Sequence, residues 1–120
     1  MALVRARCCE IIGTEIANAE VGAQYFLLGL CSLFDAMLGR PMAESIQDLP
    51  LSSTLRDALL GVPNDARSVL DVVIAYERGE WDSAVTGAEL LGIAGDLIPA
   101  SYSDALKWSR ELSRNALMKG

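Results

Sequence analysis

The side chains that could carry chemistry in this sequence are cysteines and carboxylates, because the chain contains no histidine. That absence removes Ser-His-Asp and Cys-His catalysis, histidine-ligated zinc and most general-base schemes near neutral pH. Cys8, Cys9 and Cys31 are odd in number, show no CxxC spacing and lie in apolar runs, where the thiolate is disfavoured. We therefore expect small core residues in a reducing compartment, without a metal or redox role.

The carboxylates are numerous but dispersed. Asp and Glu total 16, and the tightest group is Glu77, Glu80 and Asp82 in YERGEWD. At a helix end and in a loop, such a group is more typical of a solvated surface than of a metal site. Asp35 closes an apolar run, and we expect it to be hydrogen-bonded or solvated there, since a buried unpaired carboxylate is costly. With no glycine-rich phosphate loop, the sequence predicts no catalytic residue, cofactor or metal site.

Composition narrows the function classes. Hydrophobic residues make up 52% of the 120 residues, so the chain can bury a core and should fold as one domain, residues 1–120. A net charge of -6 argues against nucleic-acid binding, which needs clustered Lys and Arg. The apolar run FLLGLCSLF is shorter than the roughly 20 residues that span a bilayer, and charges interrupt the N-terminal segment where a signal peptide is apolar. We expect a cytoplasmic protein.

Apolar residues recur at helical spacing, and Gly and Pro separate the runs. The pattern predicts an all-α fold, a compact bundle of six or seven short helices. The expected helices cover Ala2 to Asn18, Glu20 to Leu38, Pro41 to Asp48, Ser52 (as N-cap) to Gly61, Asn64 or Asp65 (as N-cap) to Arg78, Trp81 to Leu91, and a last helix with Pro99 in its first turn.

Three packing expectations follow from this pattern. The second helix is apolar all round in its middle, so we expect it at the centre of the fold, with Gly29 at a helix crossing. The first helix should bury one stripe and the last helix another. The stripe of the first helix is Leu3, Ala6, Cys9 or the flank of Glu10, Ile12 and Ile16. The stripe of the last helix is Tyr102, Ala105, Trp108 or Ser109, Leu112 and Ala116.

The stretch FLLGLCSLFDAML resembles the central helix of the HD superfamily, whose metal-dependent phosphohydrolases carry a GLLHDIG-type motif. Gly29, Leu30 and Cys31 match its glycine and two apolar residues. Ser32 occupies the histidine slot and Leu33 the aspartate slot. Serine is a poor ligand and leucine is none, so the resemblance implies a degenerate HD-type scaffold without its metal centre.

Further segments resemble HDOD domains (HD-related output domains), above all those that follow an EAL domain in cyclic di-GMP signalling proteins. The segments are RARCCE, PMAESIQDLPLSSTLRDALLG and VLDVVIAYERGEWDSA, in order and at matching spacing over roughly residues 4 to 112. The resemblance implies a non-catalytic signalling module, here the C-terminal half of such a domain. Exposed apolar surface would then favour self-association.

Three functional readings remain. The favoured one is a bacterial output module that contacts a protein partner or an attached signalling domain. Its candidate contact residues are Tyr76, Arg78 and Trp81, because Tyr, Arg and Trp dominate binding hot spots. Tyr76 and Trp81 could equally join two helices. The alternative is a tetratricopeptide-like scaffold, suggested by AYERGEWDSAVTGAELL, although no second repeat is present. An HD-type metal-dependent phosphohydrolase is least favoured.

Overall fold

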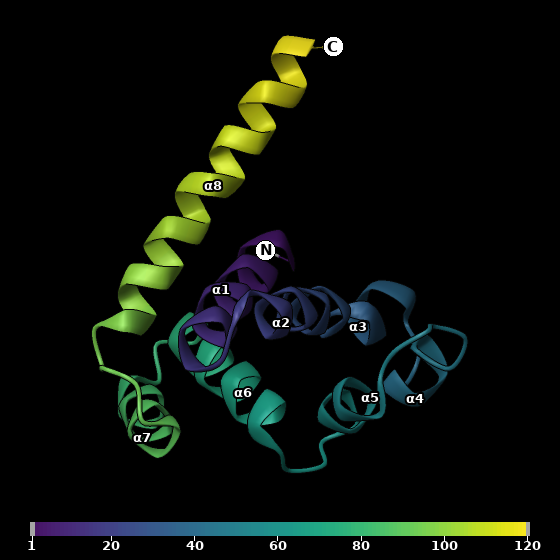
Figure 1. Cartoon of the computed structure of the whole chain (residues 1–120). Coiled ribbons are helices and arrows are strands. Elements are labelled where there is room, and N and C mark those ends of the chain that lie inside the picture. The colour runs from purple at the N-terminus through teal and green to yellow at the C-terminus, as the bar shows by residue number, and fades with distance from the viewer. Residues whose placement is uncertain (1, 120) are drawn as a thin grey trace.

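The computed structural model describes residues 2–119, and the side chains of residues 2–116. This part of the chain is all-α, as predicted, and contains no strand (Figure 1). Its helices are α1 (Ala2–Ile16), α2 (Ala19–Cys31), α3 (Phe34–Leu38), α4 (Met42–Ser45), α5 (Ser53–Leu59), α6 (Asp65–Glu77), α7 (Trp81–Leu91) and α8 (Leu97–Lys119).

Polar caps set the helix starts. The Asn18 side chain accepts from the Val21 amide at the start of α2, and Ser52 caps α5. The sequence predicts Asn64 or Asp65 as the cap of α6. In the structure the cap is Asn64, whose side chain accepts from the Arg67 amide at 2.8 Å. An Asx or hydroxyl cap satisfies amides that have no partner in the first turn.

The expected second helix is broken after Cys31, which is why the structure has more helices than the sequence suggested. The Ser32 hydroxyl donates to the Gly29 carbonyl at 2.6 Å, and Leu33 leaves the helical region. Such a side-chain bond competes with the helical ladder. The third expected helix is also shorter, since α4 begins at Met42, after Pro41, and ends at Ser45.

Helix α2 is not enclosed on all sides, although it packs on α1, α5 and α6. Helix α1 contacts α2, α6 and α8, whereas Leu27 in the middle of α2 is 38% exposed. Helix α1 can pack against helices on several sides because many of its buried residues are small. Its buried residues are Val4, Ala6, Cys8, Cys9, Ile12 and Gly13. The prediction that α2 lies at the centre with other helices packed about it is therefore only partly right, while its crossing with α1 at Gly29 is confirmed.

By length and composition alone, the segment Ala19–Leu38 could cross a membrane, with a mean hydropathy of 1.5. The same test is passed by core helices, and here the segment consists of α2 and α3 with a break between them. Tyr25, Leu28 and Cys31 of this segment belong to the hydrophobic core.

The two predicted stripes are only partly right. In α1, Leu3 is 44% exposed, and Val4 turns inward instead. In α8, Ile98 and Ala105 are buried, but Leu112 is 41% exposed and Ala116 is also exposed. The reason is length: α8 has 23 residues, or about 34 Å, against about 22 Å for the 15 residues of α1. Figure 1 shows the far half of α8 extending beyond the other helices.

Candidate functional site

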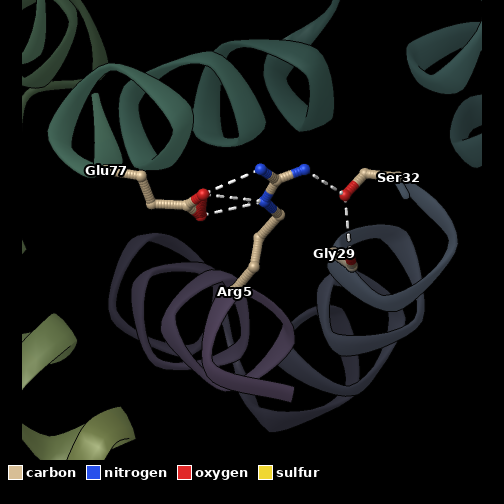
Figure 2. A network of polar contacts seen from close by, with 4 residues as sticks. All are labelled: Arg5, Gly29, Ser32 and Glu77. Atoms are coloured by element: carbon tan, nitrogen blue, oxygen red, sulfur yellow. Dashed lines mark hydrogen bonds and ion pairs between the residues drawn. The ribbon is translucent and has the colours of Figure 1, made fainter. Parts of the chain in front are cut away.

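A polar network joins three helices where the resembling segments meet (Figure 2). Arg5 of α1 makes a bidentate ion pair with Glu77 of α6. Nη2 of Arg5 lies 2.7 Å from Oε1 of Glu77, and Nε of Arg5 lies 2.9 Å from Oε2. Its third arm, Nη1, donates to the Ser32 hydroxyl at 2.9 Å. Ser32 in turn donates to the carbonyl of Gly29. The network therefore ties α1, α6 and the end of α2 together.

The pair is largely shielded from water, with side-chain exposures of 12% for Arg5 and 11% for Glu77. The hydrogen bonds that Arg5 donates to Glu77 raise the pKa of Arg5, so the guanidinium stays charged. A planar guanidinium matches a carboxylate in this geometry, and a lysine would not. Both charges are engaged with each other, and this arrangement fastens helices rather than holding a group ready to react.

The degenerate slot is part of this network. Ser32, the residue that the resemblance aligns with a metal-binding histidine, has its hydroxyl bonded to Arg5 and to the Gly29 carbonyl, and Leu33 is half-buried. Beside Ser32 lies a hollow of about 190 Å³ that also has Asp35 and Arg67 on its wall. Arg67 is bound to Asp71 and to the Ala58 carbonyl. No three His, Cys, Asp or Glu side chains of the described residues lie close enough to hold a metal ion.

The remaining candidates for chemistry take structural places. Asp35 is exposed, and its carboxylate accepts from the Ala36 amide, in line with the expected solvated position. Cys8, Cys9 and Cys31 are buried and unbridged, as expected for core residues. Burial raises the pKa of the Cys8 thiol to about 12, and it raises the pKa of the other two thiols as well. A neutral thiol is a weak nucleophile and a weak ligand.

The three candidate contact residues lie at the turn between α6 and α7. Tyr76 and Trp81 pack edge-to-face with ring centroids 5.2 Å apart, so they do staple the two helices. Tyr76 also packs on Tyr102 of α8, at 5.1 Å. Trp81 is nevertheless 57% exposed, and Arg78 is exposed. The same cluster therefore supports the fold from one side and presents an aromatic surface on the other.

Helices α6 and α7 form the pair that suggested a tetratricopeptide unit. They pack so closely that a Cβ on Gly87 would meet the Val72 side chain. The helix that follows, α8, packs mainly on α1 and only slightly on α6. A solenoid would stack its next helix on the preceding pair, so this packing does not favour the repeat reading.

Sequence reasoning missed the pairing of Arg5 with Glu77, although each lies in a segment quoted for the resemblance. A separation of 72 residues gives no periodic signal. It also missed the role of Arg56, in the segment PMAESIQDLPLSSTLRDALLG. Arg56 donates to the carbonyls of Ile46 and Leu49 and so fixes the turn before α5. The usable signal was the type of residue: an arginine amid apolar neighbours needs acceptors.

The structure is all-α, and a largely shielded ion pair links two of its helices. By sequence, the chain is similar to the uncharacterized protein YuxH of Bacillus subtilis, with 34% identity over 114 residues, 93% of this chain and 27% of that protein. It is also similar to the cyclic di-GMP phosphodiesterase CdgJ of Vibrio cholerae, with 25% identity over 114 residues, 95% of this chain and 26% of that protein. The chain thus spans about a quarter of the length of these relatives. No protein-family model matches it, and no solved structure gives a significant match.

Proposed function

We propose that this chain is a non-catalytic output module of the HDOD type that acts in cyclic di-GMP signalling in the bacterial cytoplasm. The observation that carries the proposal is the closed network of Arg5, Glu77 and Ser32. The network includes Ser32, which the resemblance aligns with a metal-binding histidine, and its polar groups are bonded to one another. The similarity to CdgJ over nearly the whole chain supports the link to cyclic di-GMP.

The proposed working surface is the exposed side of the aromatic cluster. Trp81 is held against Tyr76, so little side-chain freedom is lost when it is covered. Arg78 lies beside it, exposed and able to pair with a carboxylate of a partner. The partner would be a protein or an attached domain that handles cyclic di-GMP, and the module would pass a change of state to it.

Two measurements test the two parts of this proposal. Purified chain is incubated with cyclic di-GMP and Mg²⁺ or Mn²⁺, and nucleotide turnover is followed by chromatography. We expect no turnover above the buffer control, and turnover that scales with protein would overturn the non-catalytic assignment.

A photo-crosslinking amino acid is then placed at Arg78 in cells that express the protein, with the same residue at exposed Asp57 of α5 as the control. We expect an adduct from position 78, but not from position 57, with a protein that carries a cyclic di-GMP domain. Equal labelling from both positions, or adducts only with proteins unrelated to the nucleotide, would contradict the proposed surface.

A further inference from the structure

Charge is divided unequally along the chain. Residues 107–120 carry four of the ten basic residues and a single carboxylate, Glu111, while fifteen of the sixteen carboxylates come earlier. Residues 107–119 of this segment are the far half of α8, which extends beyond the other helices (Figure 1). The rest of the molecule is therefore acidic, and the extending half of α8 is basic. Within one copy, no ion pair within 4 Å joins Lys107, Arg110 or Arg114 to a carboxylate of the described residues.

One exposed face of α8 has both signs of charge in order. Exposed residues recur three or four positions apart, so they share a face. Together with Asp96 just before the helix, they are Asp96, Ala100, Ser103, Asp104, Lys107, Glu111 and Arg114. Near the start of α8 this face carries carboxylates and small side chains, and near the end of α8 its charged side chains are mostly basic. Such a face is complementary to itself when a second copy runs in the opposite direction.

The acidic end of this face opens onto a hollow. A space of about 590 Å³ lies between the end of α1, the loop after α7 and the start of α8. Its lining includes the carboxylates of Glu15 and Asp96 and the apolar side chains of Ile16, Leu91 and Leu97. Apolar walls with carboxylates suit the side chain of arginine, whose stem is apolar and whose head is charged.

We propose that a second copy of this chain docks on this face, with the two α8 helices antiparallel and Arg114 of each copy entering the hollow of the other. A register that sets Arg114 opposite Asp96 of the second copy also sets Lys107 opposite Ser103 and beside Asp104. The same contacts occur twice about a two-fold axis, so the dimer is closed. Antiparallel helices also place each helix end beside the opposite pole of its neighbour's dipole.

The test is a charge exchange read by sedimentation velocity, from about 1 µM to 1 mM protein. The wild-type chain should form a dimer that weakens as the salt rises from about 0.1 to 1 M. Arg114→Glu and Asp96→Arg should each raise the dissociation constant at least about tenfold, because each change places like charges together at two contacts. The double variant Arg114→Glu/Asp96→Arg should restore dimerisation.

Arg40→Glu is the matched control, since Arg40 is exposed, lies between α3 and α4, and gives the same change in net charge. It should leave the dimer unchanged. Far-ultraviolet circular dichroism confirms that each variant is folded. A chain that is monomeric throughout the range would overturn the proposal. So would a dimer that responds equally to Arg114→Glu and Arg40→Glu, or a double variant that stays as weak as the single ones.

Discussion

Gly29 of α2 lies directly against the backbone of Ala6 in α1: a Cβ on Gly29 would come within 2.7 Å of the Ala6 Cα. It would also come within 3.0 Å of the Arg5 carbonyl oxygen. Because the obstacles are backbone atoms, no side chain can move aside to make room. The distance between α1 and α2 therefore depends on the absence of a side chain at this position.

We predict that Gly29→Ala lowers the free energy of unfolding by about 1–3 kcal/mol through overpacking. Gly29→Leu should cost more, and more than Ser32→Ala, which removes one acceptor from Arg5 and one donor to the Gly29 carbonyl. Thermal melts and urea titrations measure the stability of the three variants and so their order. Gly95→Ala is the control, because nothing lies within 4 Å of its added Cβ. Equal effects at positions 29 and 95 would contradict the close crossing.

Removing the charge of Glu77 should destabilise the fold strongly. Glu77→Gln leaves the Arg5 guanidinium shielded from water without its counter-charge, and we expect a loss of about 3 kcal/mol. Arg5→Met/Glu77→Met should recover most of it, because an apolar pair needs no desolvation of charge. Asp71→Asn serves as the comparison: its pair with Arg67 is 58% exposed on the aspartate side. That change should cost no more than about 1 kcal/mol. Similar costs for Glu77→Gln and Asp71→Asn would argue against the buried network.

The buried thiols predict how stability depends on alkaline pH. The pKa of Cys8 rises from 9.0 to about 12 on burial, so above pH 9 the unfolded chain loses this proton before the folded chain does. The stability contributed by the neutral thiol is complete below pH 9 and is lost as the pH rises towards 12. Urea titrations at increasing pH should show this decline.

The comparison variant for this pH dependence is Cys8→Ala, which is less stable at neutral pH but should lose less stability over the alkaline range. A thiol reagent should label Cys8, Cys9 and Cys31 slowly at neutral pH and rapidly in denaturant. Rapid native labelling, or identical pH slopes for Cys8→Ala and the wild type, would show that the Cys8 thiol is not buried as described.

Trp81 should contribute to stability even though much of it is exposed. Its edge-to-face contact with Tyr76 predicts that Trp81→Ala costs about 0.5–1.5 kcal/mol beyond a surface truncation. Leu90→Ala on the same helix is the matched truncation, since Leu90 is 84% exposed. Chemical denaturation compares the two variants. If both are neutral, the aromatic contact does not staple α6 to α7.

The helices were largely predictable because their signals are local. Ser52 and Asn64 are short polar side chains before apolar runs, and each caps a helix as expected. Asn18, expected as the last residue of the first helix, instead caps α2, since α1 ends at Ile16. The break after Cys31 was not predictable, since it depends on a hydroxyl that bonds to its own helix and also accepts from Arg5. Helical spacing records neither of these bonds.

Helical spacing also fails to predict which residues of α8 are buried. Ile98, Ala105 and Leu112 share one helical face, and spacing alone treats them as equals. Burial depends on what lies opposite, and α1 extends far enough to cover Ile98 and Ala105 but not Leu112. For the candidate site, the sequence identified Ser32 and the Tyr76–Trp81 cluster, whereas the ion pair that ties Ser32 to α6 is visible only in three dimensions.

The packing of α1 against α2, α6 and α8 has a consequence for how the protein is made. During synthesis α1 emerges before α2, α6 and α8, the helices that later surround it. Its crossing with α2 can form early, but Glu77 and the start of α8 are added only after some 70 to 90 further residues, several seconds later at about 5–20 residues per second. Until then Arg5 has no counter-ion and the flank of Cys8 stays open. Until α6 and α8 have been made, the side of α1 that they later cover is exposed to the cell. A chaperone that covers α1 would have to leave before α8 can close over it.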